Sequence, residues 1–271
     1  MIVEVTINSR KTVLDLDNPL DISIPMQFNG QQPNAYNVKP ASSKPYEIGN
    51  FIGDTRLGGS CNFEEYTIVP HCNGTHTECV GHISEERIAI KNILRSAFFP
   101  AVLITVQPVS HSQTSDTYIP ALNPDDLIIT SDSVISAVSN YNKENIDALV
   151  IRTLPNDETK KSRRYIDNPP PFFSVEAMKA IAGSGINHLL VDIPSVDRTF
   201  DGGIMSAHHI YWDVEHGSHK VNKGNHSLKT ITEMIYVPDE IKDGEYFLNL
   251  QVAPFVSDAS PSRPILFKIK K

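Results

Sequence analysis

The chain has 271 residues, of which 40% are hydrophobic and 21% charged, and its formal net charge is −8. This composition is typical of a globular protein, and without an obvious linker the length favours one domain over residues 1–271. The acidic balance argues against nucleic acid or an anionic membrane as the main partner, since both require a basic surface. No apolar run approaches the roughly 18 residues of a membrane span.

The three cysteines all lie between positions 61 and 79. An odd number of cysteines cannot pair completely, so we expect no disulfide framework and a reducing compartment. The N-terminal sequence contains Glu4 and has no long apolar stretch after a basic end, so it does not resemble a signal peptide. These features predict a cytoplasmic protein.

In chain order, the first half reads as short strands separated by Pro, Gly and Asn. Residues 2–7 alternate like a strand at a sheet margin, and residues 102–106 predict an apolar strand. Residues 29–50 are rich in Asn, Gln, Pro and Ser and predict a long irregular excursion. Long irregular segments in compact domains are usually functional or disordered.

The second half is more regular. Residues 146–153 predict a buried strand, and residues 174–185 a helix with Ser174 as its N-cap and Gly183 or Gly185 at its end. Residues 188–193 predict a second strand, so this strand–helix–strand order favours a parallel pair with a right-handed crossover. The last strands are predicted at 230–237, 245–252 and 264–269.

The connection between the strand at 146–153 and the helix is far longer than the usual 2–6-residue loop, so we expect it to cover something. It contains the basic run KKSRR at 160–164 and NPPPFF at 168–173. We interpret the basic run as a solvated loop edge. The alternative is that Arg163 or Arg164 attracts an anionic substrate, and the sequence does not choose between these readings.

A dense cluster of chemically active side chains occupies residues 71–82, HCNGTHTECVGH. His76 and Glu78 are two positions apart, so they project to the same side of an extended segment. Imidazole together with carboxylate suits Zn²⁺, Mn²⁺ or Fe²⁺, and Asn73-Gly74 is a turn signal that would fold the preceding residues back towards His76. The alternative is a polar loop whose histidines satisfy backbone groups. The cluster lacks the CxxC or CxxH pairs of a structural zinc site.

Glu233 lies in a predicted strand, where it shares one face with aliphatic residues such as Ile231 and Ile235. A carboxylate on a core face costs several kcal/mol unless it is paired or bound to metal. The alternative is that this face is solvated and that Thr230 and Thr232 face inward. We favour the first reading, because the second would line the core with two threonines.

The segment GTHTECVGH at 74–82 resembles the Gly-Thr-His-x-Asp-x-Pro-x-His signature of the metal-dependent cyclase family, which includes bacterial kynurenine formamidase and isatin hydrolase. The resemblance implies that His76 is a metal ligand, that Glu78 replaces a bridging or chelating Asp, and that His82 is the catalytic acid/base. Val80 stands where the family has Pro. The first ligand position of the family is Cys72 here, with His71 one place earlier.

This departure leaves three readings of the first ligand position. Cys72 binds as a thiolate, a backbone shift lets His71 serve, or the ligand is lost; we favour His71. The remaining family ligands, a His and a Glu from the C-terminal half, correspond to His208, which matches better than His209, and to Glu233. The segment VDIPSVD at 191–197 also resembles a family stretch near the active site, so Asp192, Ser195 and Asp197 either orient ligands or substrate or form an Asx-rich turn.

The resemblance spans most of the chain and implies an α/β fold, with a mixed β-barrel-like sheet and flanking helices, in a homodimer or larger homo-oligomer. We expect a metal-dependent hydrolase that cleaves a small amide, cyclic amide or ester, with a C–N bond as the expected point of cleavage, using one or two Zn²⁺ or Mn²⁺ ions. Two alternatives remain. The same fold can run a lyase, isomerase or lactone-forming reaction, and the altered ligand set can belong to a metal- or small-molecule-binding relative without turnover.

Overall fold

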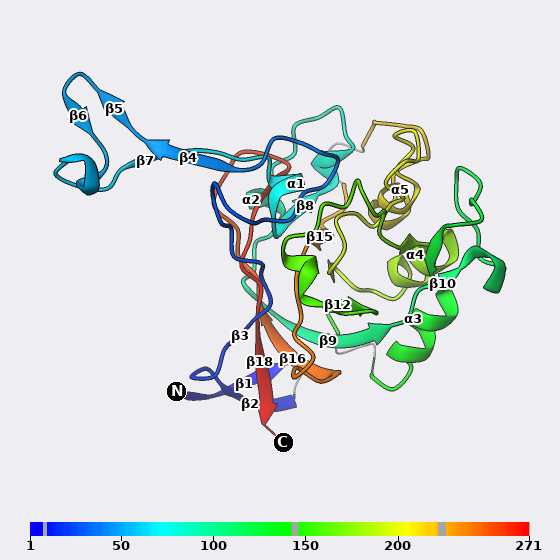
Figure 1. The fold of residues 1–271 in the computed structure, drawn as a ribbon. Coiled ribbons are helices and arrows are strands. Elements are labelled where there is room, and N and C mark those ends of the chain that lie inside the picture. The colour runs from blue at the N-terminus through cyan, green and yellow to red at the C-terminus, as the bar shows by residue number, and fades with distance from the viewer. Residues whose placement is uncertain (8–9, 143–145, 222–225, 271) are drawn as a thin grey trace.

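The computed structural model describes residues 1–7, 10–142, 146–221 and 226–270. Its main sheet is mixed, with helices against it, which confirms the expected α/β class (Figure 1). No helix within these described ranges is long and apolar enough to cross a membrane. In spatial order the main sheet comprises β1 (Ile2–Ile7), β2 (Arg10–Asp15), β18 (Ile265–Lys270), β16 (Gly244–Asn249), β9 (Phe98–Val106), β12 (Ala148–Thr153), β14 (His188–Val191), β15 (Thr230–Glu233), β8 (His76–Cys79) and β17 (Ala259–Pro261), with β3 (Leu20–Asp21) beside β18.

The centre of this sheet is parallel and buried on both faces. Strands β9, β12, β14 and β15 run parallel, and β8 pairs antiparallel with β15. One face packs against the helices through residues such as Leu149 and Met178, and the other packs against β16 and β18 through Val150 and Leu248. Burial on both faces explains why these strands read as continuous apolar runs.

The predicted strand–helix–strand unit is confirmed. Strands β12 and β14 are parallel, and helix α4 (Val175–Ala182) lies between them in sequence. The Ser174 hydroxyl accepts a hydrogen bond from the backbone N–H of Ala177, and the helix ends at Gly183. The other elements are α1 (Pro70–Asn73), α2 (Ile90–Ile93), α3 (Ser131–Val138) and α5 (Ser206–Trp212), with β10 (Val109–Ser110), β11 (Leu127–Ile129) and β13 (Phe172–Phe173) in a small sheet.

The strand predicted at 230–237 ends at Glu233, because the next residue, Met234, adopts a left-handed backbone with φ of 53°. Glu233 faces inward as expected, with 3% of its surface exposed. The reason given for this orientation, that two threonines would not line the core, was wrong, however. Thr230 and Thr232 are also fully buried, and their hydroxyls are satisfied by His188 Nδ1 and Thr77 Oγ1, both at 2.8 Å.

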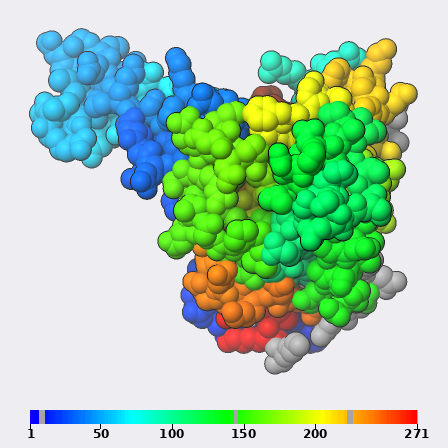
Figure 2. All heavy atoms as spheres, turned by 45° about the vertical axis from the view of Figure 1, so that its right-hand side comes forward, coloured from blue at the N-terminus to red at the C-terminus, as the bar shows by residue number. Residues whose placement is uncertain are grey.

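The excursion predicted at 29–50 is irregular only in its first part. Residues 42–67 form an arm that projects from the body in both views (Figures 1 and 2). Aromatic side chains and strand pairing give the arm its order, and Tyr46 packs on Phe63 with 5.1 Å between ring centroids. The arm contains β4 (Ser42–Pro45), β5 (Glu47–Ile48), β6 (Phe51–Ile52) and β7 (Glu64–Thr67), which pair antiparallel as β4–β7 and β5–β6.

The basic run at 160–164 is not simply a solvated loop edge, because Lys160 is 3% exposed. Its Nζ donates to Asp192 Oδ2 at 2.7 Å and to the carbonyl oxygen of Thr153 at 2.6 Å. A lysine can be buried when its charge is paired and its donors are used. The prediction of a solvated edge is therefore wrong for this residue, and the lysine ties the long connection to the carboxyl ends of β12 and β14.

Replacing Lys160 with Met should destabilise the protein by about 3 kcal/mol, because the buried Asp192 carboxylate would lose its cation. Chemical denaturation would measure the change. The matched control is Lys161→Met, since Lys161 forms a more exposed pair with Glu158 and should cost less than about 1 kcal/mol. Equal stabilities of the two variants would contradict the structural role of the buried pair.

Candidate metal centre

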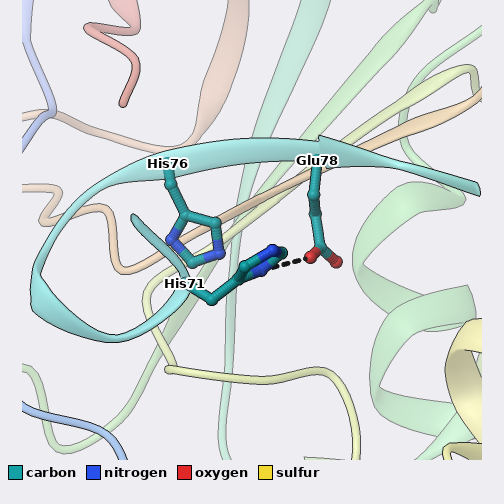
Figure 3. Close-up of side chains that lie close together, drawn as sticks. All are labelled: His71, His76 and Glu78. Atoms are coloured by element: carbon teal, nitrogen blue, oxygen red, sulfur yellow. Dashed lines mark ion pairs between the residues drawn. The ribbon is translucent and has the colours of Figure 1, made fainter. Parts of the chain in front are cut away.

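Strand pairing creates the first part of the site. In the antiparallel pair of β8 and β15, His76 lies opposite Glu233 and Glu78 lies opposite Ile231. His76 and Glu78 leave the same side of β8 (Figure 3), as their spacing predicts, and both are fully buried. His76 Nε2 lies 3.5 Å from Glu233 Oε2. The sheet thus holds one imidazole between two carboxylates.

Helix α1 brings His71 to this strand pair. The short helix starts at Pro70, and the His71 ring lies between the side chains of His76 and Glu78, with Nδ1 2.9 Å from Glu78 Oε2 (Figure 3). Cys72 is the next residue of the helix and so points elsewhere. Burial, and then the charge of Glu233, raise the pKa of the Cys72 thiol to about 11. The structure therefore brings His71, and not Cys72, into contact with Glu78.

Helix α5 supplies the opposite wall. His208 Nε2 lies 2.8 Å from Glu78 Oε1 and 3.9 Å from Glu233 Oε1. The neighbouring His209 faces a different group, and its ring centroid lies 5.9 Å from that of His216. Of the two adjacent histidines, it is His208 that joins the cluster, in agreement with the better sequence match.

His82 occupies the open side of the cluster. It ends a 3₁₀ turn after β8, stacks on His71 with 4.2 Å between ring centroids, and places Nε2 3.9 Å from Glu78 Oε2. Its ring is partly exposed and lines a pocket of about 260 Å³ together with Asp258, Ile88 and Val256. Among the clustered histidines, His82 is thus placed to meet a molecule that enters from solvent.

Two carboxylates outside the strand pair position the histidines. Asp258 Oδ2 lies 2.8 Å from His71 Nε2 and 3.4 Å from His82 Nδ1. The sequence reasoning missed Asp258, whose only sequence signal is its place directly before the strand β17 that pairs with β8. Asp197 Oδ2 lies 2.5 Å from His208 Nδ1, so this residue orients a histidine of the cluster.

The other two candidates of the 191–197 segment act differently. Asp192 accepts hydrogen bonds from Lys160 and Thr153 and does not contact the cluster. The Ser195 hydroxyl accepts the backbone N–H of Asp197, and the backbone N–H of Val196 donates to Glu233 Oε1 at 2.9 Å. The segment therefore supports the site mainly through its backbone and through Asp197.

The charges of the centre are strongly coupled. Burial raises the pKa of Glu78, but the charges of His82 and His208 lower it well below its usual range. Burial lowers the pKa of His71, but hydrogen bonds to Asp258 and Glu78 raise it to about 10. The negative charge of Glu78 is therefore favoured, and protons on His71 and His208 compensate it.

The donor set fits a divalent cation. His76 Nδ1 donates to the carbonyl oxygen of Gly74 at 3.0 Å, and the buried Nε2, 3.5 Å from Glu233 Oε2, has no hydrogen-bond partner. A histidine that binds a metal through one ring nitrogen typically donates the other ring N–H to a carbonyl or carboxylate in this way. In the part of the chain that the structure describes, three sets have ligand atoms within 4.8 Å of one another: His71, His76 and Glu78; Glu78, His82 and His208; and His71, His82 and Asp258.

The chain is similar to known proteins over most of its length. A model of the family described as "Putative cyclase" matches residues 14–198, which is more than half of the chain. A kynurenine formamidase from Bacillus cytotoxicus is 24% identical over 233 residues, covering 81% of this chain and 91% of the relative.

Solved structures share the fold. Isatin hydrolase A from Labrenzia aggregata, bound to benzyl benzoate, superposes with a TM-score of 0.59 at 16% identity, covering 92% of this chain and 93% of the other. The structure of a predicted metal-dependent hydrolase from Bacillus stearothermophilus gives a TM-score of 0.56 at 17% identity, covering 92% of this chain and 98% of the other. These similarities cover nearly the whole of each chain.

Metal binding to the purified, metal-free protein should release about two protons at pH 7, because a cation must displace those on His71 and His208. Burial lowers the pKa of His208, but Glu78 and Asp197 raise it well above its usual range, and the pKa of His71 is about 10. Both groups are thus protonated at pH 7, so metal affinity should rise as the pH rises. Calorimetry in buffers of different ionisation enthalpy counts the protons.

The variant Asp258→Asn gives an internal control. It removes the negative charge of Asp258, which raises the pKa of His71, so fewer protons should be released on metal binding than in the wild type. A metal affinity independent of pH, with no proton release, would contradict this account of the centre.

Proposed function

The chain belongs to the cyclase family, and we propose that it is a metal-dependent hydrolase of a small amide, cyclic amide or ester. One observation carries the proposal. Three histidines (His71, His76 and His208) and two buried carboxylates (Glu78 and Glu233) come together from four separate elements, and the buried Nε2 of His76 has no hydrogen-bond partner. Such a group is costly to bury unless it binds a cation.

The proposed ligands are His71, His76, Glu78, His208 and Glu233, and we propose Zn²⁺ or Mn²⁺ as the metal because both accept mixed imidazole and carboxylate ligands. A divalent ion held there would supply Lewis-acid polarisation of a carbonyl group and would lower the pKa of water. His71 contacts one oxygen of Glu78 and His208 contacts the other, so these ligands suit one ion or two ions that share this carboxylate.

His82 is the proposed acid/base. It lies at the edge of the cluster, lines the pocket beside Asp258, and has one ring nitrogen 3.4 Å from the Asp258 carboxylate. That carboxylate orients the ring, while the other ring nitrogen lies 3.9 Å from Glu78 Oε2. In this role His82 takes a proton as water attacks and returns it to the leaving nitrogen or oxygen.

The substrate class rests on the relatives. Kynurenine formamidase and isatin hydrolase, as their names state, act on an amide and a cyclic amide, and by similarity we propose the same bond type here. The pocket of about 260 Å³ beside His82 suits a small molecule. A panel of N-formyl arylamines, isatins and lactones would identify the substrate, and product analysis would separate hydrolysis from lyase or isomerase chemistry.

The change His82→Ala should lower kcat by about 10²–10⁴-fold while leaving the metal content unchanged, because the residue moves a proton and is not a ligand. Elemental analysis and turnover of the best panel substrate would measure both. His216→Ala is the control, since His216 is exposed and lies outside the cluster. Metal lost in parallel with activity would instead make His82 a ligand. Purified protein without transition metal and without response to chelators would contradict the hydrolase proposal itself.

We also propose that residues 1–271 act as one functional unit, because the centre draws on His71 in one half and on Glu233 and Asp258 near the other end. Three unpaired cysteines suit a reducing compartment such as the cytoplasm, which is the proposed location.

We further propose a homodimer or larger homo-oligomer in which the arm at 42–67 packs against a second copy. The arm leaves the body (Figure 2) and exposes Ile48, Leu57 and Tyr66 to 63%, 60% and 56%. A two-stranded ribbon is marginally stable alone, and clustered apolar side chains mark contact surfaces.

Replacing Ile48 and Leu57 together by Glu should convert the oligomer to a monomer, because charges would be buried in the contact. Sedimentation velocity reports the mass. Ile135→Glu serves as control, since Ile135 is 47% exposed on helix α3, away from the arm. A wild-type protein that is monomeric at micromolar concentration would contradict this proposal and leave the hydrolase proposal intact.

A further inference from the structure

The turn at residues 34–38 has a strained backbone. Tyr36 and Asn37 both adopt the left-handed region, each with a φ of 55°. Non-glycine residues rarely adopt this conformation, and a bulky residue such as tyrosine is an outlier there. Such strain persists only where the surrounding structure imposes it, and it clusters at functional sites. The turn is therefore a place to look for a further group that acts in the reaction.

Hydrogen bonds to two distant segments hold the turn in this conformation. The backbone N–H of Ala35 donates to the carbonyl oxygen of Cys72 at 3.0 Å, so the turn lies against α1, which carries the first histidine of the centre (Figure 1). On the other side, Arg164 Nη2 donates to Asn37 Oδ1 at 3.0 Å. Tyr36 is thus fixed between a helix of the metal centre and the long connection.

The side chain of Tyr36 reaches from solvent to the metal centre. The residue is 46% exposed, but its hydroxyl interacts electrostatically with the buried carboxylates of Glu233, Asp197 and Asp201. Glu233 is one of the proposed metal ligands. Burial, and then the charge of Glu233, raise the pKa of the Tyr36 hydroxyl, so it keeps its proton near neutral pH and remains a donor.

A hydrogen-bond chain leaves this donor free. The backbone N–H of Asp197 donates to Ser195 Oγ at 3.1 Å. Ser195 in turn hydrogen-bonds the Tyr36 hydroxyl and lowers its pKa, which is the effect of a donor on a phenol oxygen. In the described part of the chain no acceptor takes the O–H of Tyr36. A phenol has one such donor, so it is available to a bound molecule.

Tyr36 and His82 approach the centre from different sides. His82 contacts Glu78 from the side of Asp258 and the pocket, whereas Tyr36 meets Glu233 from the side of the 191–197 segment. When water attacks the carbonyl carbon of an amide or ester, the carbonyl oxygen gains negative charge. A donor that is already oriented in a partly buried site stabilises this charge without reorganisation.

We propose that the Tyr36 hydroxyl is a catalytic group, which donates a hydrogen bond to the carbonyl oxygen of the substrate as that oxygen becomes negatively charged. No proton is transferred in this step. Ser195 is a positioning residue that aims the O–H, and the strained turn places the ring. The inference rests on the proposed hydrolase function, and it gives a role to Ser195 and to the irregular segment before β4.

Tyr36→Phe should lower kcat and kcat/KM together by about 10²-fold at unchanged metal content, because the donor acts in the transition state and is not a ligand. Ser195→Ala should cost less, and it should have no further effect in the Tyr36→Phe background, since Ser195 acts through the hydroxyl that this variant lacks. Tyr246→Phe is the matched control, because the Tyr246 hydroxyl donates to the carbonyl oxygen of Lys242 outside the centre.

Binding of acetohydroxamate to the zinc-loaded protein gives a readout without turnover. Its carbonyl oxygen takes the place of the substrate oxygen, so Tyr36→Phe should weaken binding about tenfold in calorimetry, and Tyr246→Phe should bind like the wild type. Unchanged affinity and turnover in Tyr36→Phe would overturn this inference and leave the hydrolase proposal intact. Independent, additive effects of Ser195→Ala and Tyr36→Phe would contradict the positioning role of Ser195. A wild-type protein that takes up no metal would contradict the hydrolase proposal, and this inference with it.

Discussion

The structure depends on the compensation of one fully buried carboxylate, that of Glu78. An isolated charge at this depth would cost more than a domain can tolerate, so the fold must supply positive charge around it. It does so with His71 from α1 and His208 from α5, at 2.9 and 2.8 Å, and with His82 at 3.9 Å. Histidine suits this task, because its charge comes from a proton that a metal ion can displace at moderate pH. The histidines that offset the cost of burying the Glu78 charge are therefore also suitable metal ligands.

A second layer of acids keeps the histidines in place. Asp197 holds His208 and also accepts the backbone N–H of Ala207, so it fixes the start of α5 and the orientation of the ring together. Asp258 holds His71 and His82 from the side of the pocket. The two acids differ in what their histidines face: His208 is enclosed, whereas His82 borders the pocket. Because of this difference, His208 is suited to binding a cation and His82 is suited to moving a proton.

Periodicity and spacing were sufficient for the parts of the site that lie within one element. His76 and Glu78 share a strand face, and Ser174 caps its helix, because both features depend on neighbours in sequence. Contacts between distant segments were not predictable in this way. Asp258 reaches the cluster only through the pairing of β17 with β8, and Lys160 is buried only because Asp192 meets it across the connection. The threonine argument at β15 failed for the same reason, since partners on β8 and β14 satisfy both hydroxyls.

The segment from Asp192 to Asp197 shows how one short sequence can serve two purposes. Both aspartates are buried and both pair with a cation, but the cations differ. The partner of Asp192 is Lys160, whose ammonium has no lone pair with which to bind a metal while it stays charged, so this pair is permanent and fixes the connection to the sheet. The partner of Asp197 is His208, which can exchange its proton for a metal ion while the aspartate continues to hold its other nitrogen. Between the two aspartates, the backbone N–H of Val196 donates to Glu233. The Lys160–Asp192 pair therefore anchors the short stretch of chain that carries Asp197, which in turn orients His208.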